Sequence, residues 1–187
     1  MNPVEIEFKY NAEAIPLSSF VELCASRQPE NLILASGWDH FYENTKNPDA
    51  FCRLRVGPDS NQLTFKRKLA DKNNFIRTEH NIDLERHVSL EQIANLVSEF
   101  GYKPNTKLFK NCFIYKFDKH IFVYYIVYDA GMKEVGRYVE IEMSEEHPWE
   151  SEAQAMEALI ELEKVFKPLG ISPQSRIKRS LWEMYKK

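Results

Sequence analysis

Hydrophobic and polar residues alternate along many short segments of this chain, which predicts β-strands. In VEIEFKY, residues 4–10, apolar and charged residues take turns. Because successive side chains of a strand point to opposite faces, this segment would have one apolar face and one charged face. Turn residues separate the other segments of strand composition, which are 40–44, 50–56, 62–69, 75–84, 112–117, 120–129 and 137–143. So many short strands favour an antiparallel sheet that is closed into a barrel or folded into a sandwich.

Apolar residues at helical spacing predict four helices, which would pack outside the sheet. Ser89 and Gln92 have the spacing of a capping box, and Ser151 and Gln154 repeat it. The predicted helices cover residues 16–27, 89–101, 151–170 and a last segment that starts at 172 and runs toward 185. The fold class is therefore α+β.

Composition and charge narrow the class of protein. The chain has 187 residues, 43% hydrophobic and 28% charged, which suits one soluble domain with a sizeable core. We treat residues 1–187 as a single domain that includes the C-terminal helices, about 151–187. A net charge of -3 argues against general binding to nucleic acid or to an anionic membrane.

Cysteine usage and the N-terminal residues indicate the compartment. The three cysteines are widely spaced without a C-x-x-C motif, so neither a disulfide framework nor a zinc ribbon is indicated. Residues 1–20 lack the basic and apolar regions of a signal peptide, and no apolar run approaches the length of a membrane span. We expect a cytoplasmic protein.

Charged residues gather on one face of five predicted strands, and their signs are sorted. These residues are Glu5, Glu7 and Lys9; Arg53 and Arg55; Lys66 and Lys68; Arg77 and Glu79; and Glu140 and Glu142. Carboxylate pairs suit a hard divalent cation, and Arg and Lys pairs suit phosphoryl oxygens. A barrel with these faces inward would hold a wet, charge-compensated channel, because isolated buried charges are costly. The alternative is that each charged face simply lies in solvent.

Several of these stretches resemble the motifs of one family. E-I-E-F-K at 5–9 resembles the E-x-E-x-K signature of the CYTH superfamily, the triphosphate tunnel metalloenzymes, which include class IV adenylate cyclases, thiamine triphosphatases and inorganic triphosphatases. The companion motifs follow in the family's order, and R-S-L-W-E-M near the C-terminus resembles the family's closing S-Y-x-E-L. These companions are R-L-R at 53–55, L-T-F-K at 63–66, R-T-E at 77–79 and G-R-Y-V-E-I-E at 136–142.

The resemblance implies an eight-stranded antiparallel β-barrel tunnel, a divalent cation (Mg or Mn) and a triphosphate substrate. It assigns metal binding to Glu5, Glu7, Glu140 and Glu142, with Asp129 as a further ligand. It assigns phosphate binding to Lys9, Arg53, Arg55, Lys66, Arg77 and Lys110, with Glu79 as a supporting member of the channel. Lys9, Glu5 and Glu7 would be the catalytic residues, with Lys9 polarising the scissile phosphate or the water.

The chain departs from the family pattern at three places. Where the family has K-x-R on the strand after the central helix, this chain has Lys110-Asn111-Cys112, and Lys107 would serve only with a shifted register. The second acid after R-x-E is Asn81 here. Asp129 also lies at a slightly different distance from Gly136 than the family's aspartate does.

The activity expected from this resemblance is metal-dependent hydrolysis of the phosphoanhydride of inorganic triphosphate, thiamine triphosphate or ATP. One alternative is an adenylate cyclase, which needs a base pocket; Phe51, Phe65, Tyr115 and Trp38 are the stacking candidates. Another alternative is a non-catalytic polyphosphate or nucleotide-binding protein, suggested by Cys112. Whether the chain forms a homodimer stays open.

Overall fold

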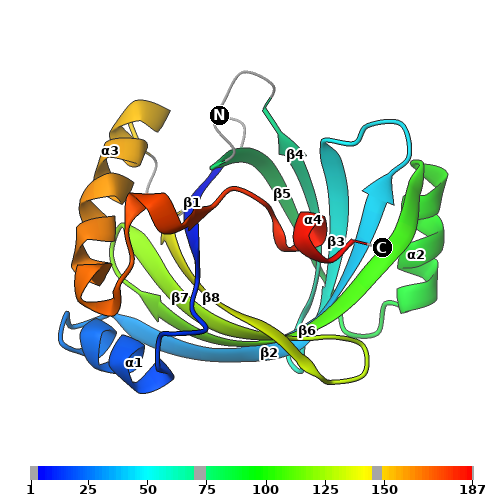
Figure 1. Cartoon of the computed structure of the whole chain (residues 1–187). Helices are drawn as coiled ribbons and strands as arrows, with labels where there is room; N and C mark the ends of the chain where they lie inside the picture. Colours follow the sequence, from blue (N-terminus) through cyan, green and yellow to red (C-terminus); the bar gives the residue numbers. More distant parts are fainter. Residues whose placement is uncertain (1–3, 70–74, 145–148, 187) are drawn as a thin grey trace.

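Eight long strands form a closed antiparallel barrel (Figure 1). The computed structural model describes residues 4–69, 75–144 and 149–186. The strands are β1 Val4–Asn11, β2 Asn31–Asn44, β3 Ala50–Val56, β4 Asn61–Lys68, β5 Ile76–Leu84, β6 Tyr102–Lys116, β7 His120–Tyr128 and β8 Glu134–Met143. They follow the order β5-β4-β3-β2-β6-β7-β8-β1, and pairing of β1 with β5 closes the ring. The predicted α+β fold with an antiparallel eight-stranded barrel is confirmed.

The alternation in β1 divides its side chains between the inside and the outside of the barrel. Phe8 and Tyr10 lie in an outer apolar core and are fully buried. Glu5, Glu7 and Lys9 point the other way and line the cavity inside the barrel. The charged face of this strand therefore faces the interior of the barrel rather than bulk solvent.

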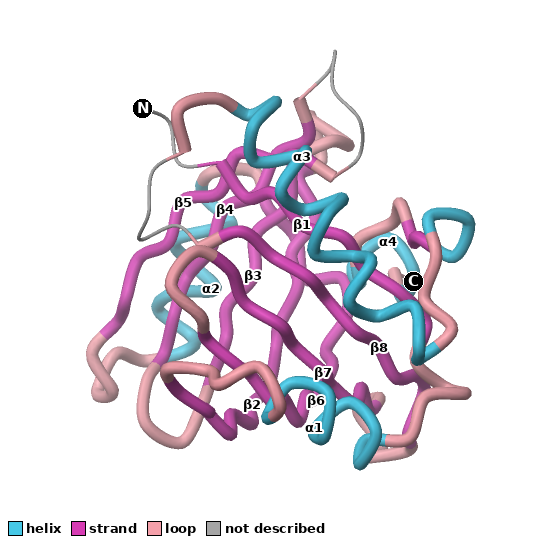
Figure 2. The backbone as a smooth tube through the Cα atoms, turned by 90° about the vertical axis from the view of Figure 1, so that its left-hand side faces the viewer, coloured by secondary structure: helices cyan, strands magenta, loops and turns pink. Residues whose placement is uncertain are grey.

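Helices cover two sides of the barrel. The helical segments are α1 Leu17–Ala25, α2 Leu90–Glu99, α3 Glu152–Glu163, η1 Lys164–Leu169, η2 Pro173–Ser175 and α4 Leu181–Tyr185. Figure 2 shows α1 and α3 on the same side, where Phe20, Leu159 and Phe166 pack in the cluster that contains Phe8. On another side, Ile93 and Val97 of α2 pack against residues of β3 and β4. None of the helices in the described residues is long and apolar enough to cross a membrane.

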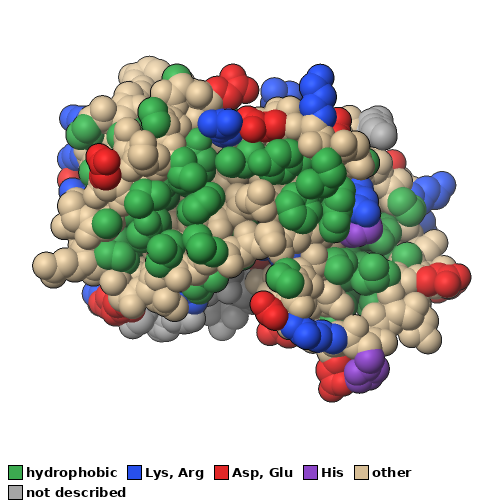
Figure 3. Space-filling model, turned by 90° about the horizontal axis from the view of Figure 1, so that it is seen from below, with side chains coloured by type: hydrophobic (Ala, Val, Ile, Leu, Met, Phe, Trp, Pro, Cys, Tyr) green, Lys and Arg blue, Asp and Glu red, His purple; other side chains and the backbone are tan. Residues whose placement is uncertain are grey.

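Two strands are much longer than their sequence pattern indicates. The predictions were 40–44 and 112–117, whereas β2 begins at Asn31 and β6 at Tyr102, because these two strands pair along their whole length. Residues 31–37 of β2 pair with β6 only, because the described pairing between β2 and β3 begins at Trp38. In this part of the strand, Leu32 and Leu34 are 46% and 68% exposed. Seen from below, apolar side chains gather over this side of the molecule (Figure 3). Residues 31–36 show no regular alternation of buried and exposed positions, so the hydrophobic pattern did not predict this part of β2.

The C-terminal segment is not the continuous helix that the sequence predicts from Ser172. It contains the short helix η2, the two-residue strand β9 Arg176–Ile177 and the helix α4. Strand β9 pairs with Lys9 and Tyr10 of β1, which interrupts any helix at this point. Ser180 then caps α4 through a capping box with Glu183. The third predicted helix, 151–170, also changes form, because it is α-helical only to Glu163 and continues as the 3-10 helix η1.

Candidate functional site

The barrel encloses a cavity of about 430 Å³ that collects most of the predicted site residues. The predicted residues that line it are Glu5, Glu7, Lys9, Arg53, Arg55, Lys66, Glu79, Lys110, Glu140 and Glu142. They come from β1, β3, β4, β5, β6 and β8. Strand pairing therefore brings together charges that are spread over more than a hundred positions of the sequence.

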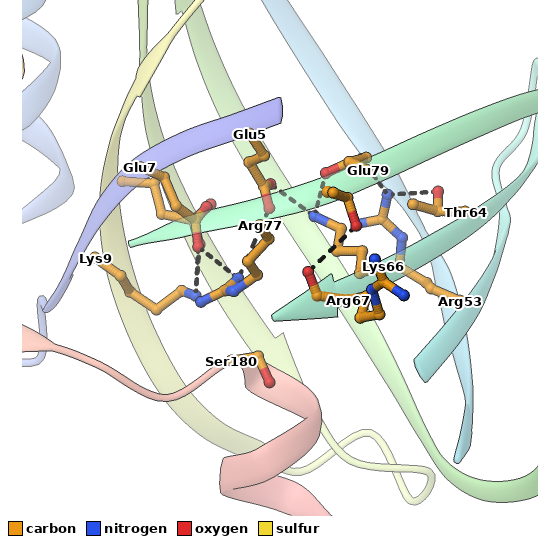
Figure 4. A network of polar contacts seen from close by, with 12 residues as sticks. Glu5, Glu7, Lys9, Arg53, Thr64, Lys66, Arg67, Arg77, Glu79 and Ser180 are labelled. Atoms are coloured by element: carbon orange, nitrogen blue, oxygen red, sulfur yellow. Dashed lines mark hydrogen bonds and ion pairs between the residues drawn. The ribbon is translucent and has the colours of Figure 1, made fainter. Parts of the chain in front are cut away.

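Lys9 lies between two carboxylates at the centre of this cluster. Its Nζ is 3.2 Å from Glu7 Oε1 and 3.1 Å from Glu140 Oε1. Arg77 approaches Glu7 from β5, with Nη1 3.1 Å from the same Oε1 atom (Figure 4). The side chains of Lys9 and Arg77 are 4% and 5% exposed, so these ion pairs are shielded from solvent.

Lys66 forms a second centre of charge beside the first. Its Nζ lies 2.6 Å from Glu5 Oε1 and 2.6 Å from Glu79 Oε2. Arg53 donates from Nη2 to Thr64 Oγ1 at 3.0 Å, and the same atom is 3.9 Å from Glu79. The predicted cations of β3, β4 and β5 thus face carboxylates of β1 and β5 (Figure 4).

Burial and crowding change the ionisation of the carboxylates. Burial, together with the neighbouring charges of Glu7 and Glu79, raises the pKa of Glu5 to about 7 in spite of Lys66. Burial and the charges of Glu5, Glu7 and Glu140 also raise the pKa of Glu142 well above its ordinary value. Burial alone would raise the pKa of Glu7 too, but Lys9 and Arg77 outweigh it and hold this pKa far below the ordinary value. Around Glu142 on β8, the cations of the cluster therefore do not fully offset the negative charge of the neighbouring glutamates.

The four glutamates suit a hard divalent cation chemically. The register pairs Glu7 with Glu142 and Lys9 with Glu140, so β1 and β8 present oxygen ligands side by side. Glu5 Oε2 is buried and has no hydrogen-bond partner in the described part of the chain. Carboxylate oxygens are the ligands that Mg and Mn take, and positive charge would relieve the repulsion at Glu142. Within the residues that the structure describes, no three acidic, histidine or cysteine side chains already form a metal-binding geometry.

An ion pair that the sequence analysis missed occupies another part of the cavity. Asp39 of β2 lies opposite Arg55 of β3, with Oδ1 2.7 Å from Nε and Oδ2 2.9 Å from Nη2. Although burial opposes it, Arg55 holds the pKa of Asp39 well below its ordinary value. The strand predicted from residue 40 began one position too late to show that Asp39 faces the cavity.

Of the residues that the sequence analysis considered, Asp129, Lys107 and Arg77 are not among those that line the cavity, whereas Lys110 is. Asp129 lies outside the cavity, and its Oδ1 accepts from the backbone N–H groups of Gly131 and Lys133, both at 2.9 Å, in the turn between β7 and β8. Lys110 lines the cavity with its Nζ 4.0 Å from the centroid of the Tyr125 ring. Lys107 lies over the ring of Trp38 instead. The structure therefore does not bring Asp129 to the four glutamates.

The departures at Cys112 and Asn81 both face the cavity. Thr64 Oγ1 donates to Asn81 Oδ1 at 2.8 Å, so this amide belongs to the polar network around Arg53. Burial raises the pKa of the Cys112 thiol. Of the aromatic stacking candidates, Phe51 lines the cavity, where it stacks on Trp182 of α4.

Part of the cavity wall is apolar, which the sequence analysis did not foresee. It is built by Ile33, Phe41, Phe51, Ile114, Ile121, Val123 and Leu181. Most of these residues belong to one cluster that also contains Trp182. The cavity thus has a charged half and an apolar half.

Solved structures share this barrel over almost its full length. A conserved hypothetical protein from Pyrococcus furiosus has 23% identity and a TM-score of 0.75, with 97% of this chain and 99% of that chain covered. The PH1012 protein from Pyrococcus horikoshii OT3 has 17% identity and a TM-score of 0.76, with coverage of 96% and 98%. A candidate adenylate cyclase from Vibrio parahaemolyticus has 15% identity and a TM-score of 0.68, with 98% of each chain covered. At these identities the likeness shows a common fold.

Comparison at the sequence level identifies the family. No curated protein matches this chain. The CYTH domain, by contrast, matches residues 3–181. Because this match spans nearly the whole sequence and includes every strand of the barrel, the chain belongs to the CYTH family.

Proposed function

We propose that the protein binds a triphosphate-containing small molecule in its barrel and hydrolyses a phosphoanhydride bond with the help of Mg or Mn. The observation that carries this proposal is the gathering of the predicted cations and carboxylates from six strands around one cavity. Replacing buried ion pairs by apolar residues often leaves a protein equally or more stable. A cluster this large is therefore better explained by binding and chemistry than by folding alone.

Phosphate would be bound by Lys66 and Arg53, which line the cavity, and by Arg77, which contacts the lining residues Glu5 and Glu7. Lys66, Arg53 and Arg77 carry donors that suit phosphoryl oxygens, and Arg offers a planar fork for two of them. In the free protein these cations are held by Glu5, Glu7 and Glu79. A bound triphosphate would exchange some of these partners for its own oxygens, which keeps the buried cations compensated.

The carboxylates have a separate role. Glu5, Glu7, Glu140 and Glu142 would hold the divalent cation, which supplies charge neutralisation for the phosphate oxygens. Lys9, which lies between Glu7 and Glu140 and contacts both carboxylates, would polarise the scissile phosphate or the water.

The hydrolytic step follows from the same groups. Water oxygen attacks the terminal phosphorus, the bond from this phosphorus to the bridging oxygen breaks, and its electron pair goes to the leaving phosphate chain. The proton of the water passes to a carboxylate of the cavity, for which Glu5 is the candidate. The products are inorganic phosphate and the shortened chain.

Phosphorus NMR of the purified protein tests this proposal. Inorganic triphosphate, thiamine triphosphate and ATP are offered in turn with Mg or Mn, and release of inorganic phosphate is expected from at least one of them. A variant with Lys66→Met, which removes a cation at the centre of the cluster, should lose this release. Formation of a cyclic nucleotide and diphosphate from ATP would establish a cyclase instead. Shifted resonances without turnover would establish a binding protein.

A further inference from the structure

Four aliphatic side chains form a continuous surface on one wall of the cavity. Ile33 of β2 pairs with Ile114 of β6, and Ile114 pairs with Val123 of β7. Ile121, two residues before Val123, faces the cavity as well. We call these four residues, Ile33, Ile114, Ile121 and Val123, the aliphatic floor.

The aliphatic floor adjoins the carboxylates directly. The register between β7 and β8 pairs Val123 with Glu140 and Ile121 with Glu142. Neighbouring strands lie about 4.8 Å apart, so Val123 and Ile121 each stand next to one of the glutamates. A molecule whose phosphates lie at the glutamates therefore has its next atoms over the floor.

The same region offers a phosphate chain little positive charge. Along β6, Lys110, Cys112, Ile114 and Lys116 face the cavity, so Cys112 and Ile114 separate the two lysines. Arg55, on the nearby strand β3, is already engaged by both oxygens of Asp39. Lys116 pairs with Ile121 and so lies at the edge of the floor. Inorganic triphosphate carries charge at both ends, and an end that lies over Ile114 and Val123 would rest on apolar side chains that cannot pair with it.

This inference rests on the proposed function and adds the substrate class: we propose that the tunnel is built for an organic triphosphate whose non-phosphate part is uncharged and apolar, and that this part binds on the aliphatic floor. The cavity of about 430 Å³ is within the range of sites for small organic molecules. Each methylene group that leaves water on this floor should improve binding about fourfold. Ile114 and Ile121 are then specificity-determining residues.

Competing substrates test the floor. The values of kcat/KM are measured with Mg for inorganic triphosphate and for hexyl triphosphate, which adds only an aliphatic chain. We expect the wild-type protein to prefer hexyl triphosphate by about tenfold or more. Ile114→Lys adds a cation to the floor and should reduce this preference at least tenfold. Leu34→Lys makes the same change on an outward position that is 68% exposed, and should leave the preference unchanged.

Failure of the two proposals can be told apart. If both compounds are cleaved with equal kcat/KM and Ile114→Lys leaves the ratio unchanged, the substrate class proposed for the aliphatic floor is wrong. The proposed hydrolase activity is then still supported. If neither compound is cleaved, the proposed hydrolase activity is wrong. Calorimetric titration then compares the binding of the two compounds, and equal Kd values would overturn the proposal for the aliphatic floor. Should Ile114→Lys fail to fold by circular dichroism, Ile114→Ser replaces it. This variant should weaken hexyl triphosphate selectively, and an equal loss for both compounds would contradict the floor.

Discussion

Asp39 and Arg55 form a two-point ion pair inside the barrel, with both carboxylate oxygens on one guanidinium group at 2.7 and 2.9 Å. The side chain of Asp39 is only 1% exposed, whereas that of Arg55 is 37% exposed. Asp39 is therefore an internal counterion of Arg55, the arginine that the family resemblance assigns to phosphate binding.

Replacement of Asp39 by Asn should release Arg55 for phosphate. Because the guanidinium group is partly hydrated, it can remain charged without Asp39. We expect KM for inorganic triphosphate to fall by about tenfold, the size of one charge-assisted contact. Steady-state phosphate release measures this value. Asp83→Asn makes the same charge change on an exposed residue of β5 and serves as the control. An unchanged KM for Asp39→Asn would mean that Arg55 does not contact phosphate.

Lys9→Met should damage both activity and stability. The change leaves Glu7 and Glu140 buried without the cation that lies between them. Breaking a buried ion pair from one side costs about 3–5 kcal/mol. Urea denaturation measures the free energy of unfolding, and phosphate release measures activity. Normal turnover in this variant would remove Lys9 from the site.

Glu142→Gln should separate these two effects. The pKa of Glu142 is raised by burial and by Glu5, Glu7 and Glu140, so an uncharged side chain is favoured at this position in the free protein. We expect unfolding at neutral pH to need at least as much urea as in the wild type, while turnover falls about 100-fold because a metal ligand is lost. A destabilised Glu142→Gln variant would contradict the charge balance described for β8.

Titration of Glu5 should link cation binding to pH. Burial and neighbouring acids raise its pKa from 4.5 to about 7, so at pH 6 most molecules carry a proton that a divalent cation must displace. Affinity for Mg should therefore be about tenfold weaker at pH 6 than at pH 8, with proton release on binding. Calorimetry in two buffers of different ionisation enthalpy detects this proton. Affinity that is independent of pH would exclude Glu5 as a ligand.

The same residue should make the metal-free protein less stable as pH rises. A carboxyl group whose pKa is higher in the folded state binds more protons when folded, so its contribution to stability falls between about pH 4.5 and pH 7. Glu5→Gln cannot lose a proton and should flatten this part of the curve of unfolding free energy against pH. A curve identical to that of the wild type would show that Glu5 titrates normally.

Gly37→Ala should destabilise the barrel where β2 meets the end of β3. A Cβ atom at this position would lie 2.6 Å from the carbonyl oxygen of Val56, and this backbone atom cannot move away without disturbing the pairing. We expect a loss of about 1–3 kcal/mol in urea denaturation. Gly131→Ala is the control, because its Cβ would lie 3.4 Å from the Asp129 side chain. Equal losses in the two variants would contradict the close approach.

The strand alternation was sufficient to predict which face of β1 points inward, because period two and the sorted charges agree at Glu5, Glu7 and Lys9. It was not sufficient for Asp39, because the first residues of β2 show no regular alternation of buried and exposed positions. The position of Asp129 depends on how a turn closes, which strand patterns do not encode. The apolar floor was missed because Ile33, Ile114, Ile121 and Val123 look like ordinary core residues until the barrel closes.

One edge of β1 is shared by two distant parts of the chain, β5 at Val4–Ile6 and β9 at Lys9 and Tyr10. A pairing between Tyr10 and Arg176 closes one of the longest loops available to this chain, and loop closure of this length slows folding. During synthesis, the strand that carries Glu5, Glu7 and Lys9 is made before all of its partners, and it can pair with β9 only after Ile177 has emerged. The last pairing of β1 therefore forms only after all eight strands of the barrel have been made.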